Sequence, residues 1–232
     1  MDKIVEGVCW YLAFLFSVTV HEAAHAWMAK FGGDMTAYHG GQVSLDPLPH
    51  VRREPVGMVL FPLISLFAMG WPFGYASTPY DPEWAHRYPK RAALMSCAGP
   101  ISNLLLVFLS GIIIKIGTTI GYFAAPHSIG NATVTIASHP GACTSVALLV
   151  SMMFTLNLIL TVLNLIPFPP LDGSGAIALF MSDETARRYR AFVRNPTFGW
   201  IGLLLAWKVF NPLFHPIFLY AINLLYPGMR YG

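Results

Sequence analysis

Charged residues are scarce in this sequence. They make up 11% of its 232 residues, whereas hydrophobic residues make up 55%, and this balance excludes an ordinary soluble globular domain. The formal net charge is only +3, and the basic residues lie at the ends of apolar segments rather than along one face. The sequence therefore gives no sign of a nucleic-acid partner and predicts a protein that crosses the lipid bilayer several times.

Cysteine is also rare, and the chain holds only Cys9, Cys97 and Cys143. No two of them have the CxxC spacing, and two lie in apolar stretches where a small buried residue is the expected role. The sequence thus predicts neither a disulfide framework nor a metal site built from thiolates.

Long apolar segments mark the expected membrane crossings. They cover residues 8–31, 56–76, 92–117, 145–167 and 198–226. The segment 56–76 contains prolines and glycines and has basic residues on both flanks. Because the positive-inside rule keeps both flanks in the cytoplasm, this segment is predicted to be a re-entrant hairpin. The loop 118–144 has no Lys or Arg and is expected outside, and the segment 198–226, which contains Pro212 and Pro216, is either one kinked span or two shorter pieces.

The strongest pattern in the chain is a pair of histidines, His21 and His25, with Glu22 directly after the first. Four residues make about one helical turn, so the two imidazoles project from one face and can hold one metal ion. Glu22 is expected to act as a base toward a water on that ion. The pattern also occurs by chance in soluble helices, but in an apolar span such groups are costly without a partner. It therefore predicts a zinc site.

A catalytic zinc site needs a third protein ligand, and Asp172 is the candidate. It follows the run Pro167-Phe168-Pro169-Pro170-Leu171 at the end of the fourth apolar segment. A helix cannot continue through these prolines, so the backbone there can present a carboxylate at the depth of the histidines. The alternative role for Asp172 is the N-cap of a helix after a proline turn.

Three motifs occur in order along the chain: His21-Glu22-Ala23-Ala24-His25, Ala98-Gly99-Pro100-Ile101-Ser102-Asn103, and the stretch from Asn164 to Gly173. Together they resemble the HExxH motif, the AGPxxN segment and the Asp-Gly motif of the site-2 protease family of intramembrane zinc metalloproteases. Leu165 stands where many members carry proline. The resemblance covers nearly the whole chain and is to the short form of the family, without a PDZ domain.

The resemblance implies a zinc metalloendopeptidase that cuts peptide bonds within or near the transmembrane segments of membrane-protein substrates. It implies one Zn²⁺ per chain, with His21, His25 and Asp172 as ligands. Glu22 is then the base that activates the water, and Asn164 steadies the substrate carbonyl or its oxyanion. The expected partners are a transmembrane protein or peptide and the lipid bilayer. A catalytically inert membrane scaffold of the same fold is the alternative, and an ion or proton transporter is a more distant one.

The predicted fold class is an all-α polytopic membrane protein, a single integral-membrane metalloprotease domain over residues 1–232. Three transmembrane helices form a core that carries the zinc site, with the re-entrant hairpin and one or more C-terminal helices beside them. Residues 40–47 alternate apolar with polar and predict a short cytoplasmic-side β element, which either covers that face or offers an edge to an extended substrate. Gly99, Pro100 and Asn103 are assigned to helix packing, with a direct catalytic part as the alternative. The protein is placed in the cell membrane, with its active site toward the cytoplasm.

Overall fold

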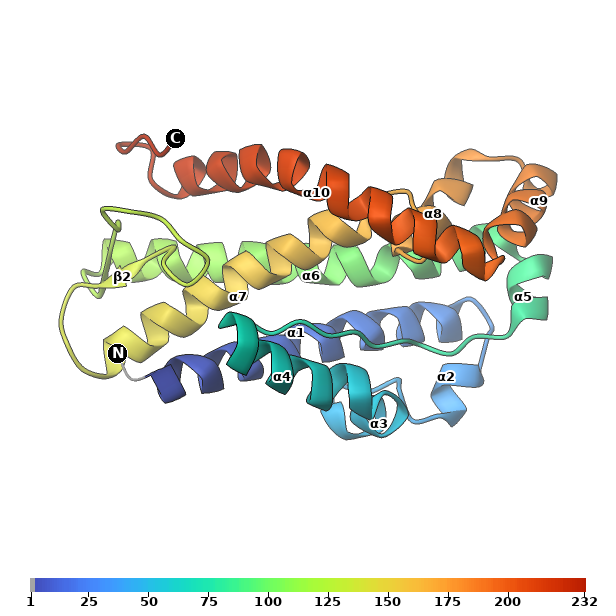
Figure 1. Cartoon of the computed structure of the whole chain (residues 1–232), viewed down its shortest axis with the longest axis horizontal. Coiled ribbons are helices and arrows are strands. Elements are labelled where there is room, and N and C mark those ends of the chain that lie inside the picture. Colours follow the sequence, from blue (N-terminus) through green and yellow to red (C-terminus); the bar gives the residue numbers. More distant parts are fainter. Residues whose placement is uncertain (1–2) are drawn as a thin grey trace.

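The computed structural model describes residues 3–232, with the backbone alone for residue 196, and consists mainly of long helices (Figure 1). Its elements in chain order are α1 (Lys3–Phe31), α2 (Thr36–His39), α3 (Pro47–Arg53), the π-helical turn η1 (Val56–Leu60), α4 (Phe61–Met69), α5 (Pro82–Arg87), α6 (Pro89–Thr119), β1 (Phe123–Ala124), β2 (Ile136–Ala137), α7 (Ala142–Asn164), α8 (Asp172–Ala176), the 3₁₀ turn η2 (Ile177–Phe180), α9 (Asp183–Val193) and α10 (Pro196–Leu225).

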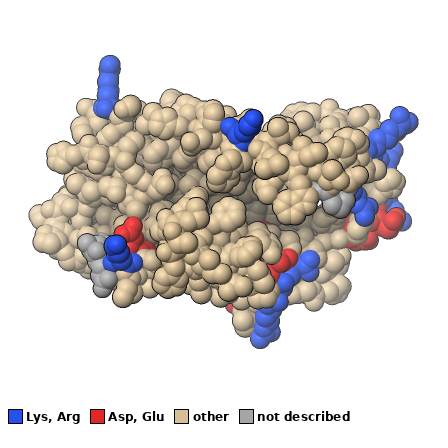
Figure 2. Space-filling view, in the orientation of Figure 1, with Lys and Arg blue, Asp and Glu red and all other residues tan. Residues whose placement is uncertain are grey.

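Within the described residues, four helices are long and apolar enough to cross a bilayer: α1, α6, α7 and α10. Each has at least 23 residues, more than the roughly 20 that span the hydrocarbon core. Figure 2 shows that most of the visible surface is free of charged side chains, as a lipid-facing surface requires. The chain is therefore a helical multi-pass membrane protein, as the composition predicts.

The helices α1, α6 and α7 meet through a buried polar cluster made of Ser17, Asn103 and Asn157. The side-chain amide of Asn103 donates to Asn157 Oδ1 (2.8 Å), and that of Asn157 donates to Ser17 Oγ (2.9 Å). None of the three residues is exposed. Because polar groups buried among apolar side chains are costly unless they are paired, these bonds fix how the three helices pack.

The C-terminal apolar segment forms one helix, α10, which continues through Pro212 and Pro216. Of the two possibilities that the sequence leaves open, the structure therefore has the single span. Phe214, Phe218 and Ile222 are among its buried side chains, and they pack in the cluster that includes the core of α7. Most of the remaining surface of α10 is exposed, as is expected of a helix at the edge of a membrane bundle.

The predicted hairpin at residues 56–76 has the shape of a helix followed by an extended return. The turn η1 and α4 lead away from α3, and residues 71–80 then run back as extended chain beside α1 (Figure 1). Arg53 Nε, before the segment, donates to the carbonyl of Ser77, after it, at 3.2 Å. The segment thus leaves and returns at the same place on the molecule, and its entry into the bilayer stays a prediction.

The prediction of a β element at residues 40–47 is wrong. Residues 40–46 form turns and bends, and Pro47 begins α3. Gly41 has a φ of +75°, which suits a turn, and Asp46 accepts a hydrogen bond from the backbone of Leu48 as the N-cap of α3. Turn and cap chemistry therefore override the alternating pattern. The strands of the described chain, β1 and β2, lie in the loop between α6 and α7, paired Phe123↔Ala137 and Ala124↔Ile136.

Candidate metal centre

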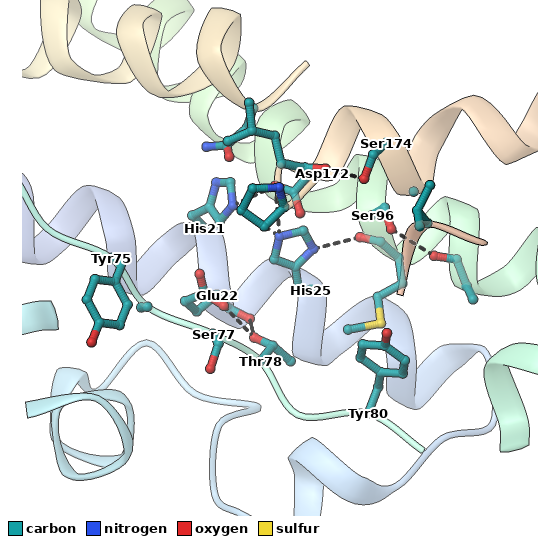
Figure 3. Close-up of a pocket in the computed structure, with 18 of the residues that line it drawn as sticks. His21, Glu22, His25, Tyr75, Ser77, Thr78, Tyr80, Ser96, Asp172 and Ser174 are labelled. Atoms are coloured by element: carbon teal, nitrogen blue, oxygen red, sulfur yellow. Dashed lines mark hydrogen bonds and ion pairs between the residues drawn. The ribbon is translucent and has the colours of Figure 1, made fainter. Parts of the chain in front are cut away.

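His21 and His25 project from one face of α1 toward Asp172, at the start of α8 (Figure 3). The two Nε2 atoms lie 3.0 Å apart. Asp172 Oδ2 lies 3.0 Å from His21 Nε2 and 3.3 Å from His25 Nε2. The structure thus brings together the three predicted ligands, which come from segments about 150 residues apart in sequence.

The hydrogen-bond partners of the two rings assign His21 Nε2, His25 Nε2 and Asp172 Oδ2 as acceptors when the rings are neutral. His21 Nδ1 lies against Asn103 Oδ1, and His25 Nδ1 lies 2.7 Å from the carbonyl oxygen of Met95. An oxygen with no proton requires the hydrogen on Nδ1, so in the neutral rings each Nε2 offers a lone pair. Two nitrogen lone pairs and a carboxylate oxygen therefore face one another with no hydrogen-bond donor among the three atoms. A cation bound between them removes their mutual repulsion.

The donor set and spacing fit zinc. Zn²⁺ takes imidazole nitrogen and carboxylate oxygen at about 2.0–2.1 Å in a tetrahedron, which separates neighbouring ligand atoms by roughly 3.4 Å. The separations of 3.0–3.3 Å in this cluster are close to that value. Three protein ligands leave a fourth position open, which is the arrangement of catalytic rather than structural zinc.

Asp172 reaches the histidines because the chain after α7 cannot continue as helix. Leu171, rather than Asp172, is the N-cap of α8, so the alternative capping role is excluded. Lys90 Nζ donates to the carbonyl oxygens of Ala178 (3.2 Å) and Leu179 (2.7 Å) and thereby ties η2 to α6.

Glu22 is buried beside the histidine pair, and it is held by a residue that sequence analysis did not identify. The hydroxyl of Thr78, in the extended segment 71–80, lies 2.8 Å from Glu22 Oε2 and 2.9 Å from the Glu22 carbonyl oxygen (Figure 3). Thr78 is 56 residues away in sequence and belongs to no motif. Its hydroxyl is a donor that sets the orientation of the carboxylate.

We expect Thr78→Val to lower kcat for peptide hydrolysis about tenfold and to change KM little, because a hydrogen bond to a charged group is lost where the base must be aligned. Steady-state kinetics on a model substrate measures both constants. Thr78→Ser keeps a hydroxyl and is expected to restore most of kcat. Equal kcat in the valine variant and the wild type would show that Glu22 needs no such alignment.

Gly99, which sequence analysis assigned to helix packing, packs against two of the predicted ligands, His21 and His25. A Cβ atom at this position would conflict sterically with Nε2 of both His21 and His25. Asn103, one turn later, is fully buried and bonds to the ring of His21 as well as to the neighbouring helices. The AGPxxN segment of α6 therefore shapes the candidate metal centre in addition to joining helices.

We expect Gly99→Ala to weaken zinc binding about 10- to 100-fold, which is the loss that follows when the support of a ligand is disturbed. Competition with a zinc chelator of known affinity measures the change. Gly111→Ala is the matched control on the same helix, because its Cβ would lie 3.5 Å from the nearest side-chain atom, an ordinary contact. Unchanged zinc affinity in Gly99→Ala would place the ion away from the two Nε2 atoms.

A cavity of about 750 Å³ opens beside these residues. His21, Glu22, His25 and Asp172 line it together with the extended segment and the end of α7, where Asn164 lies. All the site residues predicted from the sequence thus share one cavity. The role of Asn164 toward a substrate carbonyl stays a prediction.

Comparison with known proteins identifies the relatives of this chain. The model of peptidase family M50 matches residues 10–206. The chain is 32% identical to "Putative zinc metalloprotease YwhC" of Bacillus subtilis over 164 residues, which are 70% of this chain and 64% of that protein. It is 29% identical to "Putative zinc metalloprotease Rip2" of Mycolicibacterium smegmatis and of Mycobacterium tuberculosis over 177 residues, 75% of this chain. The matches span about three fifths of these curated relatives (58–64% of their length). No solved structure matches the chain.

Proposed function

Since this chain belongs to peptidase family M50, the site-2 protease family, we propose that it is a zinc endopeptidase that hydrolyses peptide bonds within or near the transmembrane segments of membrane proteins. The observation that supports this most is the convergence of His21, His25 and Asp172 beside Glu22 in one cavity. An inert scaffold could keep the three ligands, but it would have no need of a buried base aligned by Thr78.

The chain's own residues supply the steps of the reaction. His21, His25 and Asp172 hold the zinc ion, which when bound polarises the substrate carbonyl and lowers the pKa of water to about 7. Glu22 takes a proton from the attacking water as its oxygen bonds to the carbonyl carbon. Glu22 then gives this proton to the amine nitrogen as the C–N bond breaks. The side-chain N–H of Asn164 donates a hydrogen bond to the oxyanion.

Sequence analysis offered residues 40–47 as an edge for an extended substrate. We assign that role to the extended segment 71–80 instead. A peptide must be unwound from its helix before its carbonyl is accessible to a nucleophile. Residues from Phe73 to Thr78 line the cavity as extended chain, and Thr78 bonds to Glu22. A substrate strand that runs beside this segment can form main-chain hydrogen bonds with it while its carbonyl faces Glu22.

The orientation that we propose puts the α5–α9 end of the molecule in the cytoplasm. The helices α5 and α9 lie at one end and the loop with β2 at the other (Figure 1). Arginines concentrate in α9 and around α5, whereas residues 118–144 contain neither Lys nor Arg. The positive-inside rule then directs the basic end inward.

Reconstituted cleavage tests the proposed function. The purified full chain is placed in lipid vesicles with a panel of single-span peptides, and products are identified by mass spectrometry. Cleavage is expected with zinc, is expected to stop on chelation, and is expected to return on addition of zinc. A zinc-loaded protein that cuts no member of the panel would support the inert scaffold, and cleavage that survives full removal of metal would contradict the assigned chemistry.

A further inference from the structure

A row of arginines from α9 faces the cavity of the candidate metal centre. Arg187, Arg190 and Arg194 all line this cavity. Their spacing of three and then four residues places them along one side of the helix and its C-terminal end. The acidic residues that line the cavity are Glu22 and Asp172, and both belong to the metal centre. Among the described residues, none of the three arginines forms an ion pair.

Arg190 is the arginine of this row whose buried polar atoms need a hydrogen-bond partner. Its Nε and Nη2 atoms are buried and have no hydrogen-bond partner in the described structure. Burial lowers the pKa of its guanidinium from the ordinary value, and the nearby Tyr80 and Tyr189 act in the opposite direction. An arginine stays charged in proteins, so burial without a partner costs free energy that an incoming anion would recover.

The opposite side of α9 differs. Arg188 forms an ion pair with Glu184, one turn before it, and both side chains are mostly exposed, at 80% and 67%. The solvent-facing arginine of this helix therefore has an acidic partner from its own chain, whereas the cavity-facing arginines have none within the part of the chain that the structure describes. This contrast within one helix indicates that the cavity-facing row is kept free for a ligand.

We propose that Arg187, Arg190 and Arg194 form a carboxylate-binding subsite of the proteolytic cavity, which takes acidic side chains of the substrate next to its apolar span. This inference rests on the proposed proteolytic function and names the substrates that the site prefers. The guanidinium fork matches a carboxylate in a bidentate pair. A substrate peptide is favoured over a lipid headgroup because the unpartnered donors of Arg190 are buried, and because the same cavity contains Glu22.

Paired substrates test the subsite. Single-span peptides with blocked termini carry three Glu or three Gln directly next to the apolar span, with one pair for the N-terminal flank and one for the C-terminal flank. The zinc-loaded full chain is assayed in phosphatidylcholine vesicles. The wild type is expected to prefer Glu over Gln in one of the two flanks about tenfold or more in kcat/KM. A Gln peptide with a free C-terminal carboxylate shows whether a chain end can supply the anion.

Variants of α9 assign the preference to its residues. Arg190→Gln and the double variant Arg187→Gln/Arg190→Gln are expected to bring the Glu-to-Gln ratio close to one. Arg190→Lys keeps the charge but loses the fork, and it is expected to give an intermediate ratio. Arg188→Gln is the matched control and is expected to keep the wild-type ratio. Zinc content and circular dichroism verify that each variant is folded.

A binding assay separates failure of the subsite from failure of the proposed function. Fluorescent versions of the same peptides are titrated with zinc-loaded Glu22→Gln protein, so the comparison needs no turnover. Tighter binding of the Glu peptide that depends on Arg190, with no cleavage by the wild type, would support the subsite and reject the protease. Equal cleavage and equal binding of Glu and Gln peptides would overturn the subsite alone. So would a Glu preference that survives the arginine substitutions, or one that these substitutions change only when the assay is repeated in vesicles that contain anionic lipid.

Discussion

Replacing Glu22 with glutamine is expected to lower kcat for peptide hydrolysis by roughly 10²- to 10⁴-fold, the contribution of a positioned general base, while bound zinc stays at the wild-type level. The physical reason is that glutamine keeps the size of the side chain and can still accept a hydrogen bond from Thr78, but cannot accept a proton from water. Single-turnover cleavage of a model substrate, together with zinc analysis of the same sample, measures both effects.

A control on the same helix makes the Glu22→Gln result specific. Glu6→Gln removes one carboxylate near the other end of α1, outside the cavity, and is expected to leave cleavage unchanged. Wild-type turnover in Glu22→Gln would reject Glu22 as the base. Loss of zinc in this variant would instead indicate that Glu22 is a ligand, and the set of zinc ligands would have to be reassigned.

Replacing Asp172 with alanine is expected to remove zinc and cleavage together. The change leaves two imidazoles as the only protein ligands. Loss of a residue that merely supports a metal ligand costs about 10- to 100-fold in affinity, and loss of the ligand itself should cost more. Zinc is measured by plasma mass spectrometry after dialysis against buffers of fixed free zinc. The expected result is full occupancy in the wild type and very low occupancy in Asp172→Ala at the same free zinc.

Asp183→Ala provides the comparison for this second prediction. Asp183 is an exposed carboxylate in the first turn of α9 and lies outside the cavity. Its loss is expected to leave zinc binding intact. If Asp172→Ala bound zinc as the wild type does, the third ligand would have to come from another residue.

Much of the candidate site could be predicted from the sequence, because the constraints on it are local and strong. The spacing of His21 and His25 fixes one helix face, and an apolar span makes buried ionisable groups costly. The prolines before Asp172 end the helix and so indicate where a carboxylate can be presented. The long apolar runs likewise predict the spanning helices, because a bilayer requires a minimum length.

The remaining features depend on contacts between distant segments, which no local pattern encodes. Thr78 reaches Glu22 only because the extended return of residues 71–80 lies beside α1. Asn103 was assigned to helix packing, and its bond to the His21 ring follows from how α6 docks on α1. The failed β prediction at residues 40–47 has a related cause, since a strand needs a partner and the turn at Gly41 and the cap at Asp46 offer the chain another structure.

X-ray absorption at the zinc edge of the purified protein tests most directly whether His21, His25 and Asp172 hold a catalytic zinc ion. The expected result is one zinc per chain in a nitrogen and oxygen environment at about 2.0–2.1 Å, with two imidazoles and no sulfur, and loss of this signal in Asp172→Ala. A spectrum with sulfur ligands, or a signal that Asp172→Ala leaves unchanged, would contradict it.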